Sequence, residues 1–348
     1  GHVLKQTGSM EQMIKSINAL IADLRIATAA LPLLIGMLTV PGGAILSAPM
    51  CGELGHRLNM PPARCAVANI WFRHVSYFML PLFPSLILAA ELSGAGVTTF
   101  IIYNFHLTVI GALAGFSFFF RGSSKASGDR PPAAKTRAGE RPIAELLNFC
   151  QSILPLVTIM FLVIFFNLYF PLALLLGLLT AFLNYLPREG RGQVLLHRLK
   201  TMLLPGINIR IVLVIVGIMF YKEMLAYTRA VFHLTEFLLY LGIPLIFLIL
   251  TLPFLIGMLT GDNSASVGIV FPLFLPLLPQ GTGAYPAYLA FLYACSTAGH
   301  IISPAHPCFA LTKEYFAVDI KEIIKLMLPL LLLVTLLAFF TTLFFGYF

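Results

Sequence analysis

The chain has 348 residues, of which 59% are hydrophobic and only 10% are charged, a composition typical of a polytopic helical membrane protein and not of a soluble enzyme. Its formal net charge of +8 does not indicate a nucleic-acid partner, because the Lys and Arg residues lie in short segments between apolar stretches, as in the cytoplasmic loops of membrane proteins. We therefore expect a chain embedded in a lipid bilayer, with no nucleic acid bound.

The chain opens with a mixed polar and apolar segment, residues 1–30, whose apolar side chains recur at helical spacing. This pattern predicts a helix that lies along the membrane face. Over about 27–55, two apolar runs flank a tip between Thr39 and Gly43 that is rich in Gly and Pro. Each run is too short to cross a hydrocarbon core that needs about 20 helical residues, so we predict a re-entrant hairpin.

The next span, about 66–90, contains Pro81 and Pro84, which remove backbone hydrogen bonds and predict a discontinuous helix. A further span at about 98–120 completes the first predicted repeat, residues 1–120. Residues 121–143 are polar, basic and rich in small residues, and they predict a flexible cytoplasmic linker.

Residues 144–348 form the second predicted repeat. Its predicted elements, in chain order, are three scaffold spans at about 146–167, 170–186 and 207–226, a re-entrant hairpin at about 243–278, a discontinuous helix at about 287–311 and a terminal span at about 326–348. Pro304 and Pro307 interrupt this second discontinuous helix as the earlier prolines interrupt the first.

The two repeats share sequence. Leu252–Thr260 is identical to Leu31–Thr39 at eight of nine positions. The proline pairs of the two discontinuous helices have the same internal spacing and match each other when the repeats are aligned. Paired interrupted segments in the two halves of a membrane protein are the sequence pattern that best indicates a transporter's binding site.

The distribution of positive charge predicts the topology. With the linker in the cytoplasm, alternation of the spans places four segments on that side, namely 56–64, 121–143, 187–200 and 312–325. They contain 2, 6, 4 and 3 Lys or Arg residues, 15 of the chain's 22, as the positive-inside rule requires. The first hairpin then enters from the cytoplasm and the second from outside, so the repeats are inverted. Because only the second repeat has scaffold spans before its hairpin, we expect about two further spans ahead of Gly1 in a longer protein.

Asp262 is the only carboxylate in either predicted hairpin tip. An acid at membrane depth costs about 2.5–3.5 kcal/mol on insertion scales, so it normally has a partner or a function. Together with Asn263 and Ser264 it is a candidate for holding a coupling Na⁺, or for carrying a coupling proton. The alternative is that Asp262 only caps the helix that follows it.

Arg73 lies within the first discontinuous helix, where its guanidinium can hold a carboxylate in a bidentate pair. It can instead extend to the cytoplasmic surface or pair with an acid of the scaffold. The remaining candidates for binding a solute or an ion are small and hydroxyl residues of the tips and interruptions, namely Thr39, Gly42, Gly43, Ser47, Thr260 and Ser303. Their hydroxyls are as well suited to bonding helix carbonyls as to touching a ligand.

His300 and His306 flank the interruption of the second discontinuous helix. Neutral imidazoles can donate to a bound anion, and histidine is suited to proton coupling. No thiolate or carboxylate lies near them at ligand spacing, which argues against a metal site. His74, beside Arg73, is interpreted as a helix-packing residue.

Four motifs, PGGAILSAP, NIWFRH followed by PLFP, LTGDNSASVGIVFP and ISPAHPCFALTKEYF, resemble the uncharacterised prokaryotic domain-of-unknown-function 401 (DUF401) family of membrane proteins. That family is grouped with the ion transporter superfamily, which includes gluconate permeases and divalent anion:sodium symporters. The resemblance implies a homodimeric, elevator-type carrier in the inner membrane of a prokaryotic cell, with a scaffold domain and a moving transport domain. It does not identify the solute.

The sequence therefore favours an all-α, inverted-repeat secondary transporter of an organic anion such as a carboxylate, coupled to Na⁺ or H⁺. A cation/proton antiporter, with Asp262 as the exchanging acid, is the alternative within the same class. An intramembrane enzyme is disfavoured, because an aspartyl dyad needs a second acid that the first tip lacks, and a serine nucleophile needs a positioned base. No cofactor is expected apart from Na⁺ as a coupling ion.

Overall fold

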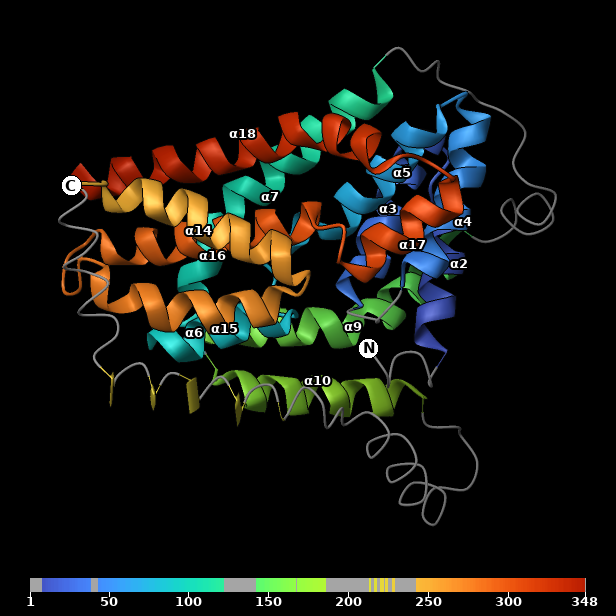
Figure 1. The fold of residues 1–348 in the computed structure, drawn as a ribbon. Coiled ribbons are helices and arrows are strands. Elements are labelled where there is room, and N and C mark those ends of the chain that lie inside the picture. The colour runs from blue at the N-terminus through green and yellow to red at the C-terminus, as the bar shows by residue number, and fades with distance from the viewer. Residues whose placement is uncertain are drawn as a thin grey trace.

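The structure is a computed structural model, and it describes residues 8–38, 43–121, 142–166, 168–185 and 242–347, together with isolated positions between 213 and 228. All regular elements in these ranges are helices, which confirms the predicted all-α fold (Figure 1). The α-helices are α2 (Ser9–Leu20), α3 (Leu24–Met37), α4 (Ala44–Arg57), α5 (Pro62–His74), α6 (Pro84–Ser93), α7 (Val97–Phe120), α9 (Pro142–Phe166), α10 (Phe170–Tyr185), α14 (Leu245–Thr260), α15 (Asn263–Phe274), α16 (Tyr285–Ile302), α17 (Pro307–Phe316) and α18 (Ile320–Tyr347).

Three of the described helices are long and apolar enough to cross a membrane. The spans are Val97–Phe120 in α7, Ile143–Phe166 in α9 and Ile320–Phe345 in α18. Large apolar side chains such as Phe165 on α9 and Leu175 on α10 are exposed on the surface, as expected where a protein contacts lipid tails instead of water. The chain is therefore a multi-pass membrane protein.

Two pairs of short helices, α3 with α4 and α14 with α15, form helical hairpins. They occupy the two segments in which hairpins were predicted. Each of these helices is shorter than the roughly 20 residues that a membrane crossing needs. In each hairpin the two helices pack against each other and against an interrupted helix, α5 in the first half and α16 in the second.

Both helices predicted to be discontinuous are interrupted in the structure. α5 ends at His74 and continues through a 3-10 turn, η1 (Val75–Phe78), before α6 begins at Pro84. α16 ends at Ile302, and α17 begins at Pro307. A proline suits the first position of a helix, because it has no N–H to donate and its φ angle is already helical. The second proline of each predicted pair therefore marks the point where the helix resumes.

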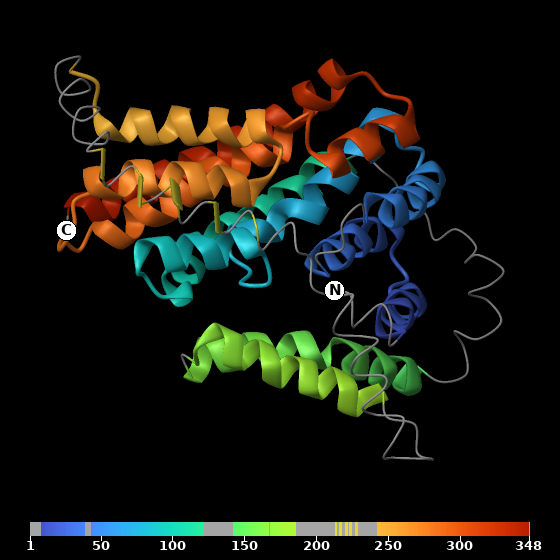
Figure 2. The same ribbon diagram turned by 60° about the horizontal axis from the view of Figure 1, so that its bottom comes forward.

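Each hairpin packs against a helix from the other half of the chain. α17, from the second half, lies on α4 and α5, whereas α6, from the first half, lies on α15. The long helices α7 and α18 pack along α5 and α16, so both hairpins and both interrupted helices share one core (Figures 1 and 2). Because α6 and α17 each pack on the hairpin of the other half, the halves interlock and the two interruptions lie together.

The sequence repeat is also a repeat of packing. Gly36 in α3 and Gly257 in α14 occupy the same place in the repeated segment. A Cβ atom on Gly36 would collide with the backbone carbonyl of Arg73, and one on Gly257 would collide with the backbone carbonyl of Ser296. Arg73 and Ser296 are themselves equivalent when the two interrupted helices are aligned on their proline pairs. Each hairpin therefore meets its interrupted helix, backbone to backbone, at an equivalent glycine.

Replacing Gly257 by alanine is expected to destabilise the protein by about 1–3 kcal/mol, the usual cost of overpacking a core. Alanine normally favours a helix over glycine, but here the new methyl group would meet the backbone of Ser296 and His300. The check is the midpoint of thermal unfolding of the purified protein. The matched control is Gly283→Ala, where nothing lies within 4 Å of the added methyl group. A midpoint for Gly257→Ala equal to that of the wild type would show that α14 and α16 are not in this contact.

α9 and α10 form a pair at one side of the molecule, set apart from the hairpin helices (Figure 2). The pair packs against α2, where the Ser16 hydroxyl donates a hydrogen bond of 3.0 Å to the Glu145 carboxylate. Most of the linker predicted at 121–143 and most of the third scaffold span predicted at about 207–226 lie outside the described residues.

Candidate functional site

A group of buried polar side chains lies where α15 begins beside α6 and α16. We call it the polar cluster, and its members are Ser85, Asn263, Ser266, Tyr293, Ser296 and Thr297. The Asn263 amide nitrogen donates to the Ser85 hydroxyl at 3.0 Å and to the Thr297 hydroxyl at 3.1 Å. Its amide oxygen accepts from the Ser296 hydroxyl at 3.2 Å. Polar groups at membrane depth must find partners inside the protein, and Asn263 has three.

The first interruption reaches the polar cluster through Tyr77 and Ser85. The Tyr293 hydroxyl donates to the Tyr77 carbonyl at 2.9 Å and lies 3.2 Å from the Ser85 hydroxyl. The Tyr77 ring stacks on Phe83 with the ring centroids 3.6 Å apart. An interrupted helix leaves carbonyls without their usual intrahelical partners, and the Tyr293 hydroxyl supplies one here. The second interrupted helix, through α16, is thereby anchored to the interruption in the first half.

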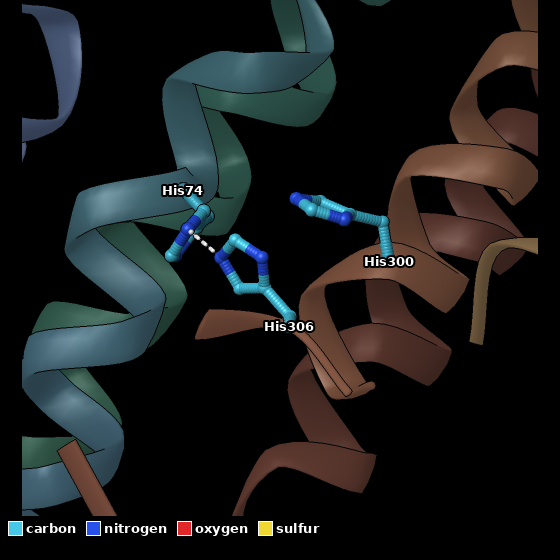
Figure 3. Close-up of side chains that lie close together, drawn as sticks. All are labelled: His74, His300 and His306. Atoms are coloured by element: carbon cyan, nitrogen blue, oxygen red, sulfur yellow. Dashed lines mark hydrogen bonds between the residues drawn. The ribbon is translucent and has the colours of Figure 1, made fainter. Parts of the chain in front are cut away.

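Three imidazole rings form a second buried group, the histidine cluster, which consists of His74, His300 and His306 (Figure 3). They come from the end of α5, the last turn of α16 and the residue before α17. The Nε2 atoms of His74 and His306 are 2.9 Å apart, and the ring centroids of His300 and His306 are 4.1 Å apart. The cluster lies where the two interruptions face each other, with rings from both halves of the chain.

Backbone carbonyls orient two of the three rings. His74 Nδ1 lies 2.7 Å from the Ile70 carbonyl oxygen, and His306 Nδ1 lies 3.3 Å from the Gly261 carbonyl oxygen. His300 is 4% exposed, and its Nδ1 has no hydrogen-bond partner among the residues that the structure describes. The cluster therefore has more ring nitrogens than the described protein groups satisfy.

Arg73 lies against the first hairpin. Its side chain is 2% exposed, and its guanidinium contacts Gly43, the residue at the N-terminal end of α4. A Cβ atom on Gly43 would lie 2.9 Å from the guanidinium carbon, so glycine at this position makes room for the cation. A guanidinium and the N-terminus of a helix both favour negative charge. This junction is therefore suited to an anion.

Both hairpins reach the same centre through neighbouring residues. Arg73 contacts Gly43 of the first hairpin, and the Nε2 atom of the next residue, His74, lies 2.9 Å from that of His306. His306 in turn faces the carbonyl of Gly261 at the tip of the second hairpin. The two hairpins and the two interruptions thus form one continuous set of contacts.

Asp262 lies at the tip of the second hairpin and is exposed. It is the N-cap residue of α15, and its carboxylate accepts a hydrogen bond from the backbone N–H of Ala265 at 2.8 Å. This is the capping arrangement that was the alternative interpretation of the residue. The structure places an exposed carboxylate directly before the buried amide of Asn263.

Other predicted candidates bond to nearby backbone. The Ser47 and Thr260 hydroxyls donate to carbonyls of their own helices, at 3.4 and 2.8 Å. The Ser303 hydroxyl donates to the Met258 carbonyl, which ties the second interruption to α14. Ser264 is partly buried in the first turn of α15. The hydroxyls of Ser47, Thr260 and Ser303 therefore stabilise the elements that carry the site.

Thr39 and Gly42, which were predicted at the tip of the first hairpin, lie outside the described residues. The distance between Gly42 and Asn263, which would measure the separation of the two tips, lies outside them too. What the structure describes of the first tip begins at Gly43 and its contact with Arg73.

His74 was expected only to pack between helices, and the structure places its ring in the histidine cluster. His74 and His306 are 232 residues apart, and no local spacing relates them. The repeat could have indicated one further residue of the site. Aligning the two interruptions on their prolines matches Tyr77 and Phe83 with His300 and His306. That alignment selects Tyr77, whose carbonyl bonds to the polar cluster.

Comparison with known proteins gives a family and a fold. A family model described as "Protein of unknown function (DUF401)" matches residues 1–344. No curated protein matches the chain. A crystal structure of the Alcanivorax borkumensis YdaH transporter, reported to have an unusual topology, is similar with a TM-score of 0.61. The two are 17% identical, and the similarity covers 100% of this chain and 85% of the other, so it establishes a shared fold.

Proposed function

The chain belongs to the DUF401 family of proteins of unknown function, and because its fold is that of a transporter, we propose that it is a secondary transporter of a small solute. The observation that supports this most is the meeting of two hairpins and two interrupted helices at one buried polar centre. An interrupted backbone at membrane depth is tolerated where it lines a cavity or binds a ligand. Paired interrupted helices hold the solute and the coupling ion in several transporter folds.

The proposed solute is an organic anion such as a carboxylate. Arg73 is buried, and its guanidinium lies against Gly43 at the N-terminal end of α4. A guanidinium matches the two oxygens of a carboxylate, and the first turn of α4 adds a positive dipole end. Both features favour a negatively charged group at this place.

The proposed driving force is a gradient of Na⁺ or H⁺, with Asp262 as the acid of the coupling site. Its carboxylate is exposed at the second tip and precedes Asn263, whose amide oxygen is part of the polar cluster. Carboxylate and amide oxygens are the ligands that hard cations take in proteins. The cap hydrogen bond to Ala265 holds the carboxylate at the tip.

In the membrane, the proposal places the first hairpin as re-entrant from the cytoplasm and the second as re-entrant from outside, as inverted repeats. The hairpins and interrupted helices then form the moving transport domain of an elevator-type homodimer, and α9 and α10 belong to the scaffold. The separation of the α9–α10 pair from the hairpin helices is consistent with this division (Figure 2).

A protease site inserted after Arg130, within the basic linker, is expected to be cut only from the cytoplasmic side, because basic segments are retained there. The check compares cleavage in right-side-out and inside-out membrane vesicles. The matched control is the same site inserted after Gly281, between α15 and α16, which this topology places outside. Cleavage of the linker site in right-side-out vesicles would show that the topology is the reverse of the one proposed.

Thermal unfolding of the purified protein with a panel of organic anions tests the proposed solute class. A ligand that binds only the folded state raises its stability, by about 2.7 kcal/mol at a concentration 100 times its dissociation constant. We expect a carboxylate to raise the unfolding midpoint, and its uncharged amide analogue to leave it unchanged. Stabilisation by the amide and the carboxylate alike would contradict recognition of an anion.

A further inference from the structure

The hydrogen bonds of the histidine cluster fix the direction of its lone pairs. A carbonyl oxygen only accepts a hydrogen bond, so the Nδ1 atoms of His74 and His306, which face carbonyls, carry the hydrogen in each neutral ring. Both Nε2 atoms then present lone pairs, and these atoms lie 2.9 Å apart. Two lone pairs that face each other repel, and a cation between them turns the repulsion into attraction.

The third ring identifies the kind of cation. A proton shared between His74 and His306 would satisfy two rings and leave His300 without a role. His300 is buried, its Nδ1 has no partner among the described residues, and one ring nitrogen from each of the three histidines lies within 4.8 Å of the other two. A metal ion uses all three rings at once.

Packing alone does not account for these histidines. The equivalent positions of the first repeat, found by aligning the proline pairs, hold Tyr77 and Phe83, which stack on each other with centroids 3.6 Å apart. His300 and His306 occupy the same two places with centroids 4.1 Å apart. The two positions thus hold a tyrosine and a phenylalanine ring in the first repeat and two imidazoles in the second. The imidazoles of the second repeat lie beside a third imidazole, His74, from the first half (Figure 3).

We propose that His74, His300 and His306 form a binding site for one divalent transition-metal ion of the zinc class. Three imidazoles and an open fourth position are a common arrangement for Zn²⁺, which takes nitrogen ligands at about 2.0–2.1 Å. Nitrogens at that distance from one tetrahedral ion lie about 3.3 Å apart, so small ring movements bring the present geometry into range. The carbonyls of Ile70 and Gly261 hold two rings as outer partners of a metal-bound histidine do.

The site goes beyond the proposed transport function, because it joins the two halves of the chain through a metal ion. No carboxylate or thiolate belongs to the group among the described residues, so the fourth position is open to water or to an anion that offsets the charge of the ion. Binding would link the end of α5 to both sides of the second interruption. Metal is therefore expected to raise the stability of the folded protein.

The test is titration of Co²⁺ into the purified full chain, with any purification tag removed and with prior treatment by a chelator. We expect saturation at one ion per chain, with the visible absorption of four-coordinate Co²⁺, and displacement of that absorption by Zn²⁺. His74→Gln, His300→Gln and His306→Gln should each lower the affinity at least about 100-fold, because even loss of an outer partner costs 10- to 100-fold. The matched control is His106→Gln, whose ring bonds to the Thr341 hydroxyl of α18 and not to the cluster.

Absence of the Co²⁺ absorption in the wild-type protein would overturn the proposal, and this result requires no variant to fold. Binding that survives in all three cluster variants, or that is lost in His106→Gln, would assign the metal to other histidines. Because the measurement needs no solute or gradient, its outcome is independent of whether the protein transports an anion.

Discussion

Replacing Arg73 by lysine is expected to weaken the binding of an organic anion by roughly 10- to 100-fold, since a hydrogen bond to a charged group contributes about 1.5–3 kcal/mol. Lysine keeps the positive charge but lacks the planar fork that grips both oxygens of a carboxylate. The guanidinium is buried against Gly43, so a shorter, compact ammonium cannot take over the same contacts. The measurement is the concentration of carboxylate needed for half-maximal thermal stabilisation.

The matched control for this change is Arg25→Lys. Arg25 lies in the first turn of α3, where it pairs with Asp23 at 2.7 Å, away from the interruptions. Its replacement should leave anion affinity unchanged. Equal affinities for Arg73→Lys and the wild type would remove Arg73 from the solute site and leave it a packing role.

Replacing Asp262 by asparagine is expected to leave the protein folded and to reduce gradient-driven accumulation by roughly 100-fold or more, because even the loss of a partner outside the ligand shell costs a metal site about 10- to 100-fold. Asparagine is as good an N-cap residue as aspartate, so the hydrogen bond to the Ala265 N–H can persist. What is lost is the charge that the proposed coupling cation needs. The measurement is accumulation of solute with and without a Na⁺ or pH gradient.

The chain supplies a matched control for capping. Asp23 is the N-cap residue of α3, and it accepts a hydrogen bond from the Arg25 N–H at 2.9 Å. Asp23→Asn therefore makes the same chemical change at the start of a helix in the other hairpin. Normal accumulation by Asp262→Asn would show that this aspartate only caps its helix, and loss of accumulation in both variants would point to a folding defect.

The hairpins and the helix interruptions of the described residues could be predicted from the sequence, because each has a local cause. The proline pairs mark the interruptions, since α6 and α17 begin at Pro84 and Pro307. The repeated segment contains Gly36 and Gly257, where the absence of a side chain lets each hairpin lie against the backbone of its interrupted helix. Prolines act on their own backbone, so their effect can be read without knowing the neighbours.

The site could be predicted only in part, because its chemistry is assembled from distant segments. Asn263 was selected at the second tip, but its partner Ser85 is 178 residues away. His74 was interpreted from the sequence as a helix-packing residue, whereas its partner His306 comes from the other half of the chain. The exchange of α6 and α17 between the halves, which brings these residues together, has no signature in the residues themselves.

The repeat also shows how two equivalent places acquired different chemistry. Tyr77 and Phe83 supply stacked rings and a carbonyl to the polar cluster, and their equivalents His300 and His306 supply nitrogens to the histidine cluster. The common backbone arrangement is therefore kept, while the two equivalent positions carry Tyr77 and Phe83 in one interruption and imidazoles in the other. Such divergence suits a centre that binds more than one kind of group.

The most direct test of the proposed function is uptake of a labelled carboxylate, chosen as the most stabilising one, into proteoliposomes that contain the purified protein. We predict accumulation above the external concentration when an inward Na⁺ or H⁺ gradient is imposed, and equal concentrations on both sides when the gradient is dissipated. Collapse of a pH gradient on adding a cation, with no organic solute present, would instead identify a cation/proton antiporter. Failure of every stabilising carboxylate to accumulate under either gradient would contradict the proposed function.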